Sequence, residues 1–345
     1  MSNAWTRRSV LKAAGALALV PILPRGVRAE LPELSGPTMG TQFSVRIQRA
    51  PSGLYLPKLR RAIERVLQTT ENLMSTYRAD SELSRFNDSE NHRWQKISYP
   101  VARVVQTALQ VQTQSGGAFN PAAAPLVDYW GFGAVPGALV GAARPLPDGL
   151  MKRVANANIE LKAGHIRKQH PHAALDLNAI AKGDALDQVA GVLQRAGIDD
   201  YLVEVGGEIR ARGNGPGGHG WRVGIHGPEG DIRRAIRLNG KAVATSGDYV
   251  DYFIAGGKRY SHILDPRTGK PVEHALSLVS VVADNAMQAD AWATALLVMG
   301  PEKATRHATR HAMAALFLAR NGNEFLEFAT PAFERLRLDH EEMRS

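Results

Sequence analysis

A carboxylate and a hydroxyl in the C-terminal third of this 345-residue chain have the spacing of a metal site. Asp290 and Thr294 are four residues apart in a predicted helix over residues 285–299, so they share one helical face. Together they offer two hard oxygen ligands to Mg²⁺, although an exposed polar face would have the same spacing. Apolar residues surround Asp290 in the sequence, and we therefore expect its carboxylate to be partly buried beside a cation.

A second group of polar residues, Asp176, Asn178 and Lys182, surrounds the start of another predicted helix. This helix covers residues 181–196, with Asn178 as a candidate N-cap and Gly197 as its C-terminal stop. Free backbone N–H groups and a lysine at a helix N-terminus suit a phosphate group. An ordinary capped helix packed on the hairpin that follows it explains this stretch equally well.

A histidine lies just before a strong turn signal, Asp265-Pro266-Arg267-Thr268-Gly269. His262 follows a predicted hairpin strand, which would deliver its imidazole to a site built from loops. Such a side chain can accept a proton near neutral pH, although a lone histidine is more often structural. His165, His170 and His172 have no acidic neighbours or helical spacing, and we interpret them as solvated loop residues rather than metal ligands.

The elements that must position these residues indicate an α+β protein with mainly antiparallel sheets and packed helices. The predicted strands come as hairpins rather than as regular βαβ units, which favours antiparallel pairing. The hydrophobic periodicity predicts helices over residues 57–74, 100–115, 148–156, 181–196, 285–299 and 301–310. It predicts strands over residues 42–47, 201–205, 208–212, 221–225, 276–283, 314–318 and 324–328.

The charge of the chain does not indicate a nucleic-acid partner. The formal net charge is +9, but the first 29 residues hold five basic residues and no acid. The rest carries 37 basic and 33 acidic residues with no long basic run, so we expect no nucleic-acid binding. The chain has no cysteine, which excludes a thiolate metal site and a lipoprotein anchor.

Residues 1–29 have the pattern of a twin-arginine signal peptide. Arg7 and Arg8 precede the apolar stretch 13–23, and Val27-Arg28-Ala29 is a plausible cleavage site. The apolar stretch is too short to span a bilayer comfortably, so we favour cleavage over an uncleaved anchor. We expect export to the periplasm by the twin-arginine route and no membrane span after cleavage.

Several motifs, taken in their order along the chain, resemble the ApbE family of FAD:protein FMN transferases. They are Thr38-Met39-Gly40-Thr41, Met74-Ser75-Thr76-Tyr77, Ser84-Arg85-Phe86-Asn87, Gly117-Ala118-Phe119-Asn120, Trp130-Gly131-Phe132-Gly133, Asp176-Leu177, Ala181-Lys182-Gly183, Val205-Gly206-Gly207-Glu208, Ser261-His262-Ile263-Leu264-Asp265-Pro266 and Gln288-Ala289-Asp290 with Thr294. The resemblance implies one flavin transferase domain over residues 30–330, made of two closely joined lobes, and a C-terminal tail over 331–345.

The resemblance also implies a reaction and a set of site residues. FAD would be split at its pyrophosphate, FMN would pass to a Thr or Ser of an acceptor protein, and AMP would leave. By position in the motifs, the FAD site would be lined by Met39, Tyr77, Ala118, Phe119, Asn120, Asp176, Lys182 and Leu264. Mg²⁺ would be held by Asp290, Thr294 and the carbonyl of Ala179, and His262 would be the base.

Two departures from the family pattern bear on the flavin contacts. Asn120 stands where many members have Asp, and the run Ala122–Ala124 replaces a more Thr/Gly-like sequence. The export signal resembles the branch linked to nitrous oxide respiration, which suggests a membrane-bound acceptor flavoprotein with a periplasmic FMN domain. Three other readings stay open: an FAD-binding carrier, an FAD pyrophosphatase with water as acceptor, and an assembly factor without flavin affinity.

Overall fold

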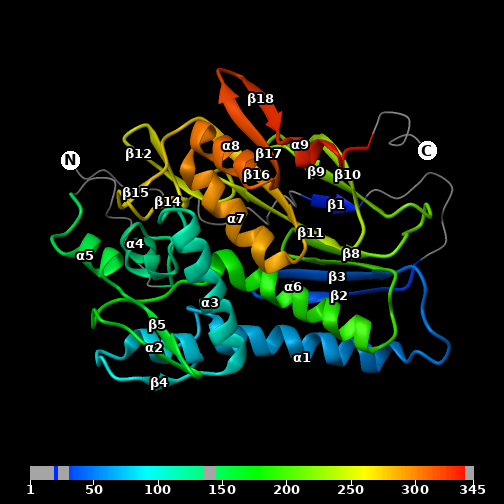
Figure 1. Cartoon of the computed structure of the whole chain (residues 1–345), viewed down its shortest axis with the longest axis horizontal. Helices are drawn as coiled ribbons and strands as arrows, with labels where there is room; N and C mark the ends of the chain where they lie inside the picture. The colour runs from blue at the N-terminus through cyan, green and yellow to red at the C-terminus, as the bar shows by residue number, and fades with distance from the viewer. Residues whose placement is uncertain (1–18, 22–30, 135–144, 339–345) are drawn as a thin grey trace, which may run out of the picture.

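The computed structural model of the chain describes residues 19–21, 31–134 and 145–338 (Figure 1). The helices are α1 (Leu56–Met74), α2 (Glu82–Asp88), α3 (Tyr99–Gln114), α4 (Ala124–Tyr129), α5 (Leu150–Ala155), α6 (Asn178–Arg195), α7 (Ala286–Met299), α8 (Pro301–Arg310) and α9 (Pro331–Glu334), with a 3-10 turn at Pro121–Ala123. The strands are β1 (Leu19–Pro21), β2 (Glu33–Thr38), β3 (Thr41–Ile47), β4 (Gln95–Lys96), β5 (Glu160–Lys162), β6 (His165–Arg167), β7 (Tyr201–Val205), β8 (Glu208–Arg212), β9 (Trp221–His226), β10 (Ile232–Leu238), β11 (Lys241–Gly247), β12 (Tyr252–Ala255), β13 (Lys258–Ser261), β14 (Leu264–Asp265), β15 (Lys270–Pro271), β16 (Leu276–Ala283), β17 (Ala314–Asn321) and β18 (Glu324–Ala329).

A large antiparallel sheet is the centre of the molecule. In the described residues it has eight strands in the order β18-β17-β16-β11-β8-β7-β3-β2. Side chains alternate between its two faces, as the period of a strand requires. Tyr201 and Val203 pack with α1 and α6, whereas Leu202 packs with the small sheet β1-β9-β10 on the other face. Both faces are therefore buried.

The second lobe is mainly helical and lies beside α6 at the left of Figure 1. Its core contains apolar residues of α2 and α3 and the short sheet β4-β6-β5, packed against the first turn of α6. The segment between β6 and α6 connects this lobe to the sheet lobe. The prediction of an α+β fold with antiparallel sheets and two joined lobes is confirmed.

The two ends of the chain are described only in part. Leu19–Pro21, inside the predicted signal peptide, forms β1 and pairs with β9, and Leu19 is fully buried. Residues 1–18 and 22–30 lie outside the described part, and so do residues 339–345 of the predicted tail. Among the described helices, none combines the length and the apolar character that a membrane crossing requires.

The start of α6 differs from the expectation for Asn178. The helix begins at Asn178 rather than at Ala181, and the capping position is Leu177, which makes no side-chain cap. Asn178 is therefore not the N-cap. Instead Asp176 Oδ1 accepts the backbone N–H of Asn178 at 2.8 Å, because the carboxylate folds back over the first turn.

Helices α6 and α7 approach each other closely above one face of the sheet (Figure 1). Gly183 lies at this crossing, where an added Cβ would stand 2.4 Å from the carbonyl oxygen of Ala286. One turn later, the Asp187 carboxylate accepts the N–H groups of Ala286 and Met287 at 2.9 and 3.0 Å. A side chain of α6 thus completes the N-terminus of α7 and fixes the relative position of the two helices.

We predict that Gly183→Ala will destabilise the protein by about 1–3 kcal/mol, because the new methyl group must push backbone apart. Gly191→Ala on the same helix is the control, since its Cβ would meet only the flexible Arg195 side chain at 3.2 Å. The control should be neutral or stabilising by up to about 1 kcal/mol. Urea unfolding measures both, and equal stabilities would contradict this account of the crossing.

Candidate active site

A buried cluster of charged residues lies where α6, α7 and β8 meet. Lys182 Nζ is 3.0 Å from Glu208 Oε1 and 4.0 Å from Asp290 Oδ2. The two carboxylates are nearly inaccessible, with side-chain exposures of 5% and 6%, whereas the lysine side chain keeps 33%. The expected burial of Asp290 is confirmed, and the positive charge beside it among the described residues is the Lys182 ammonium.

The environment shifts the pKa values of all three groups. Burial raises the pKa of Glu208 to about 8, and the nearby charge of Asp290 adds to this shift. Burial also raises the pKa of Asp290, against the opposing effect of Lys182. Burial alone would lower the pKa of Lys182, but Asp290 and Glu208 more than reverse this and raise it. One lysine thus faces two carboxylates that are costly to ionise together.

Glu208 is a site residue that the sequence reasoning did not select. It follows the Gly206-Gly207 turn, so it is the first residue of β8, and the turn places it against α6 and α7. Its Oε2 is buried, and a hydrogen bond between the Glu208 and Asp290 carboxyl groups contributes to the pKa shifts of both. The signal for it was present in the Gly-Gly-Glu motif, but its partner Lys182 lies in a different element.

The predicted metal ligands Asp290 and Thr294 lie on α7, and the third, the Ala179 carbonyl, belongs to the first turn of α6. Thr294, one turn further along α7, shares a hydrogen bond of 2.9 Å between its hydroxyl and that of Ser246 in β11. The backbone of α6 is not helical at Ala179. The N–H of Gly183 in α6 donates to Asp290 Oδ2 at 3.2 Å, which ties the carboxylate to the first turns of this helix.

The segment that carries Asp176 is fixed by hydrogen bonds to the helical lobe. Asn87 of α2 forms two bonds of 2.8 Å with the backbone N–H and carbonyl of Leu175. The fully buried Lys168 donates to the Asn87 carbonyl at 2.7 Å. The N–H of Asp176 donates to the Pro121 carbonyl at 2.7 Å. The carboxylate of Asp176 therefore has a defined place beside the first turn of α6.

The predicted flavin-site residues differ in how they could contact a ligand. Ala118, Phe119 and Leu264 are buried in the core, so they could touch a ligand mainly through backbone or a small apolar surface. Met39 has a left-handed backbone with φ of 44°. Asn120 uses its Oδ1 to accept the N–H of Ala122 at 2.9 Å, so this amide starts the 3-10 turn.

Tyr77 has a side chain that is 67% exposed. Partial burial and the charges of Asp176, Asp251 and Asp128 raise the pKa of its hydroxyl. An exposed aromatic ring at this position can stack on a planar ligand.

His262 directly follows β13, as predicted. Both its N–H and its Nδ1 are bonded to the Asp251 carbonyl, at 3.0 and 2.9 Å. Because a carbonyl only accepts, Nδ1 must carry the proton in the neutral ring, which leaves Nε2 as an acceptor. Burial lowers the pKa of His262, against the opposing effect of Asp251, and Lys182 lowers it further.

The comparisons with known proteins assign the chain to a family. The family model of the ApbE family matches residues 39–317. This chain belongs to the ApbE family. The FAD:protein FMN transferase of Vibrio cholerae serotype O1 is 38% identical over 314 residues, which are 89% of this chain and 92% of the relative. The protein of the same name from Escherichia coli K12 is 33% identical over 344 residues, which are 97% and 98% of the two chains.

Solved ApbE structures share the fold. The flavin transferase ApbE from Vibrio cholerae has a TM-score of 0.79 at 34% identity, over 89% of this chain and 99% of that one. The apo form of the Pseudomonas stutzeri flavinyl transferase ApbE has a TM-score of 0.80 at 34% identity, over 89% and 96%. The resemblance to this family that the motifs predicted is confirmed.

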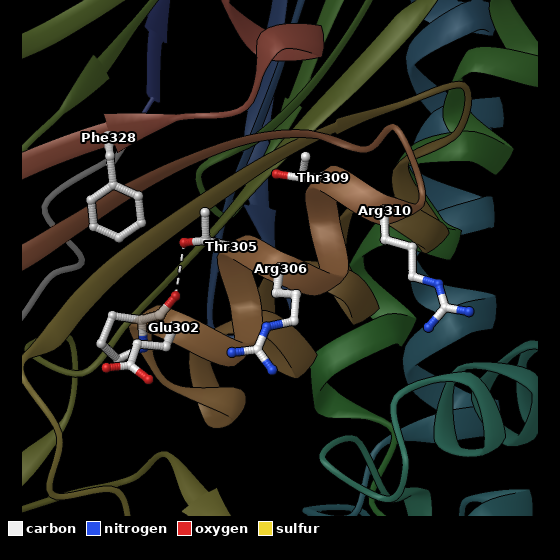
Figure 2. Close-up of a pocket in the computed structure, with 7 residues that line it drawn as sticks. Glu302, Thr305, Arg306, Thr309, Arg310 and Phe328 are labelled. Atoms are coloured by element: carbon white, nitrogen blue, oxygen red, sulfur yellow. Dashed lines mark hydrogen bonds between the residues drawn. The ribbon is translucent and has the colours of Figure 1, made fainter.

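An open depression of this ApbE-family chain lies apart from the predicted site residues. Figure 2 shows this open depression on α8 and β18, with Thr305 Oγ1 bonded to the Pro301 carbonyl at 2.8 Å. Arg306, Arg310 and Phe328 belong to its lining, which contains none of the predicted site residues. This depression therefore contributes none of the residues that the motifs assign to the site.

We predict that Glu208→Gln will flatten the pH dependence of stability in protein kept free of metal with a chelator. The folded-state pKa of about 8 exceeds the ordinary value of 4.5, so the folded protein holds an extra proton between these pH values. Wild-type stability should therefore fall as pH rises from 4.5 to about 8, on the order of 1 kcal/mol per pH unit. In denaturant melts, the stability of Glu208→Gln should change less with pH than that of the wild type. The exposed control Glu324→Gln should show the wild-type dependence on pH. Equal slopes would refute the assignment.

Proposed function

We infer that this chain is a periplasmic, Mg²⁺-dependent flavin transferase that uses FAD as substrate. It would break the FAD pyrophosphate, attach FMN through a phosphoester to a Thr or Ser of an acceptor flavoprotein, and release AMP. The observation that carries this proposal is the buried Lys182–Glu208–Asp290 cluster at the start of α6. The names of the relatives, FAD:protein FMN transferase, support the same reaction.

The start of α6 suits the pyrophosphate of FAD. The positive end of the helix dipole and the Lys182 ammonium both attract phosphate oxygens. The raised pKa of Lys182 keeps its ammonium charged at any physiological pH. Phosphoryl transfer depends on neutralised charge and correct placement more than on covalent help, and both come from fixed groups here.

The residues around Asp290 fit a magnesium ion. A buried carboxylate, the Thr294 hydroxyl and the Ala179 carbonyl are hard oxygen donors of the kind that Mg²⁺ prefers. If both carboxylates of the cluster ionise, a single lysine leaves one buried negative charge, which favours a bound cation. When bound, Mg²⁺ would supply charge neutralisation at the phosphates.

His262 would act as the base. Its Nε2 would take the proton of the acceptor hydroxyl as the hydroxyl oxygen bonds to the phosphorus of the FMN half. The bond from that phosphorus to the bridging oxygen breaks, and AMP leaves with this oxygen. The lowered pKa of His262 keeps the ring neutral, and therefore able to accept a proton, at neutral pH.

The compartment and the partner are proposed from the N-terminal sequence. A twin-arginine signal over residues 1–29 would export the protein, and the acceptor would be a flavoprotein with a periplasmic FMN domain. A membrane-bound flavoprotein of nitrous oxide respiration is the specific candidate. Pull-down from a periplasmic extract tests this proposal, and repeated failure to recover any flavoprotein would count against it.

We predict that the mature protein with FAD, Mg²⁺ and an acceptor domain will form flavin-labelled acceptor and AMP in equal amounts. Asp290→Asn should lower the rate at least about 100-fold, because it removes charge at the metal site. Flavin fluorescence after denaturing electrophoresis and chromatography of AMP measure the two products, with the exposed Asp199→Asn as control. Formation of AMP without labelled acceptor would indicate a pyrophosphatase. Binding of FAD without either product would indicate a carrier.

We predict that His262→Asn will reduce the transfer rate about 10²- to 10⁴-fold at constant FAD affinity, because the amide cannot accept the proton. His165→Asn, on the exposed face of β6, should have no effect. In the wild type the rate should fall only below the ordinary histidine pKa of 6.5, since the pKa of His262 is lowered. If the rate starts to fall above pH 6.5 as the pH is lowered, the assignment of His262 as base is contradicted.

A further inference from the structure

A partly buried ion pair lies at the start of the turn whose Asp251 carbonyl contacts His262, outside the site described above. Asp248 is 8% exposed and receives two hydrogen bonds from the Arg320 guanidinium, of 2.6 and 2.7 Å. Arg320 belongs to β17, two strands away from β11, whose end Asp248 follows. This two-bond geometry between a planar guanidinium and a carboxylate is the most directional ion pair that proteins form.

Other elements hold the same aspartate. Its N–H donates to the Ser277 carbonyl at 3.0 Å, and the Ser277 hydroxyl donates to Asp248 Oδ1 at 3.0 Å. Arg259 of β13 donates to the Asp248 carbonyl at 2.6 Å. Backbone and side chain of Asp248 are therefore fixed by β16, β17 and β13 together.

Asp248 begins the turn that contacts His262. Three residues after Asp248, the carbonyl of Asp251 bonds both the N–H and the Nδ1 of His262. A shift of this turn would move the carbonyl that fixes the ring and its tautomer. Among the described residues, the Asp251 carbonyl is the only hydrogen-bond partner of the His262 ring.

We propose that Asp248 and Arg320 are positioning residues for His262. They fix the turn 248–251, so that the Asp251 carbonyl holds the imidazole with its proton on Nδ1 and its acceptor nitrogen at Nε2. This inference rests on the role of His262 in the proposed function. A pair that merely stabilises the sheet would leave the tautomer and the pH profile of His262 unchanged.

The test compares Arg320→Ala, Arg320→Lys and Asp248→Asn with a matched control. The control is Arg234→Ala, because Arg234 pairs with Glu327 between β10 and β18, with side-chain exposures of 31% and 17%. The Asp248–Arg320 pair has exposures of 11% and 31%. Folding of each variant is first verified by thermal melting, and Arg320→Lys, which keeps the charge, is used if Asp248→Asn does not fold.

Nitrogen NMR of His262 in metal-free protein is the readout that does not depend on activity. The wild type and Arg234→Ala should show the Nδ1–H tautomer, and Arg320→Ala a mixture of tautomers. In the transfer assay, kcat of Arg320→Ala should fall about 10- to 100-fold with KM for FAD within about two-fold, and Arg320→Lys should recover part of it. The acid limb of the pH profile of Arg320→Ala should also move. Arg320 pairs with Asp248, and the charge of Asp248 raises the pKa of His262, as Asp251 does, whereas Lys182 lowers it.

A folded Arg320→Ala with the wild-type tautomer and pH profile would overturn the inference. So would an equal loss of kcat in Arg234→Ala, because the effect would then be one of general stability. Absence of transfer in the wild type would instead refute the proposed function, and the NMR comparison would still decide whether the pair positions the ring.

Discussion

The structure depends on one constraint, which is the burial of two carboxylates with a single lysine. Glu208 and Asp290 are almost inaccessible, and Lys182 reaches both of them. Removing ionised groups from water costs several kcal/mol per ion unless they are paired. A cluster with too few cations is a poor choice for stability alone, whereas it suits a site that receives a metal ion and a pyrophosphate. The elements around it can be understood as the means of holding this arrangement.

Three elements contribute the groups of the site, each at a fixed place. Lys182 and the unusual backbone at Ala179 come from α6, Asp290 and Thr294 from α7, and Glu208 from the first position of β8. Gly183 lets the two helices approach closely, and the Asp187 carboxylate fixes the start of α7. The large sheet, which is buried on both faces, provides the rigid support. Positions set by packing in this way need little rearrangement when charge develops during a reaction.

Sequence patterns predicted the local part of this structure. Helical spacing placed Asp290 and Thr294 on one face, and the strands that were predicted as hairpins pair in antiparallel fashion. Patterns with a period of two or four residues do not report which distant segments meet. The contact of Glu208 with Lys182 and the pair of Asp248 with Arg320 therefore could not be predicted. Asn178 was assigned as a cap from its residue type, but the neighbouring carboxylate of Asp176 accepts the N–H instead.

The most direct test of the central claim is a crystal structure of the protein soaked with FAD and Mn²⁺, with anomalous diffraction recorded at the manganese edge. The account predicts one manganese peak within bonding distance of Asp290 and Thr294, with the pyrophosphate of FAD next to Lys182 and the first turn of α6. A manganese peak or a pyrophosphate placed elsewhere, with the Lys182 cluster unchanged, would contradict the account.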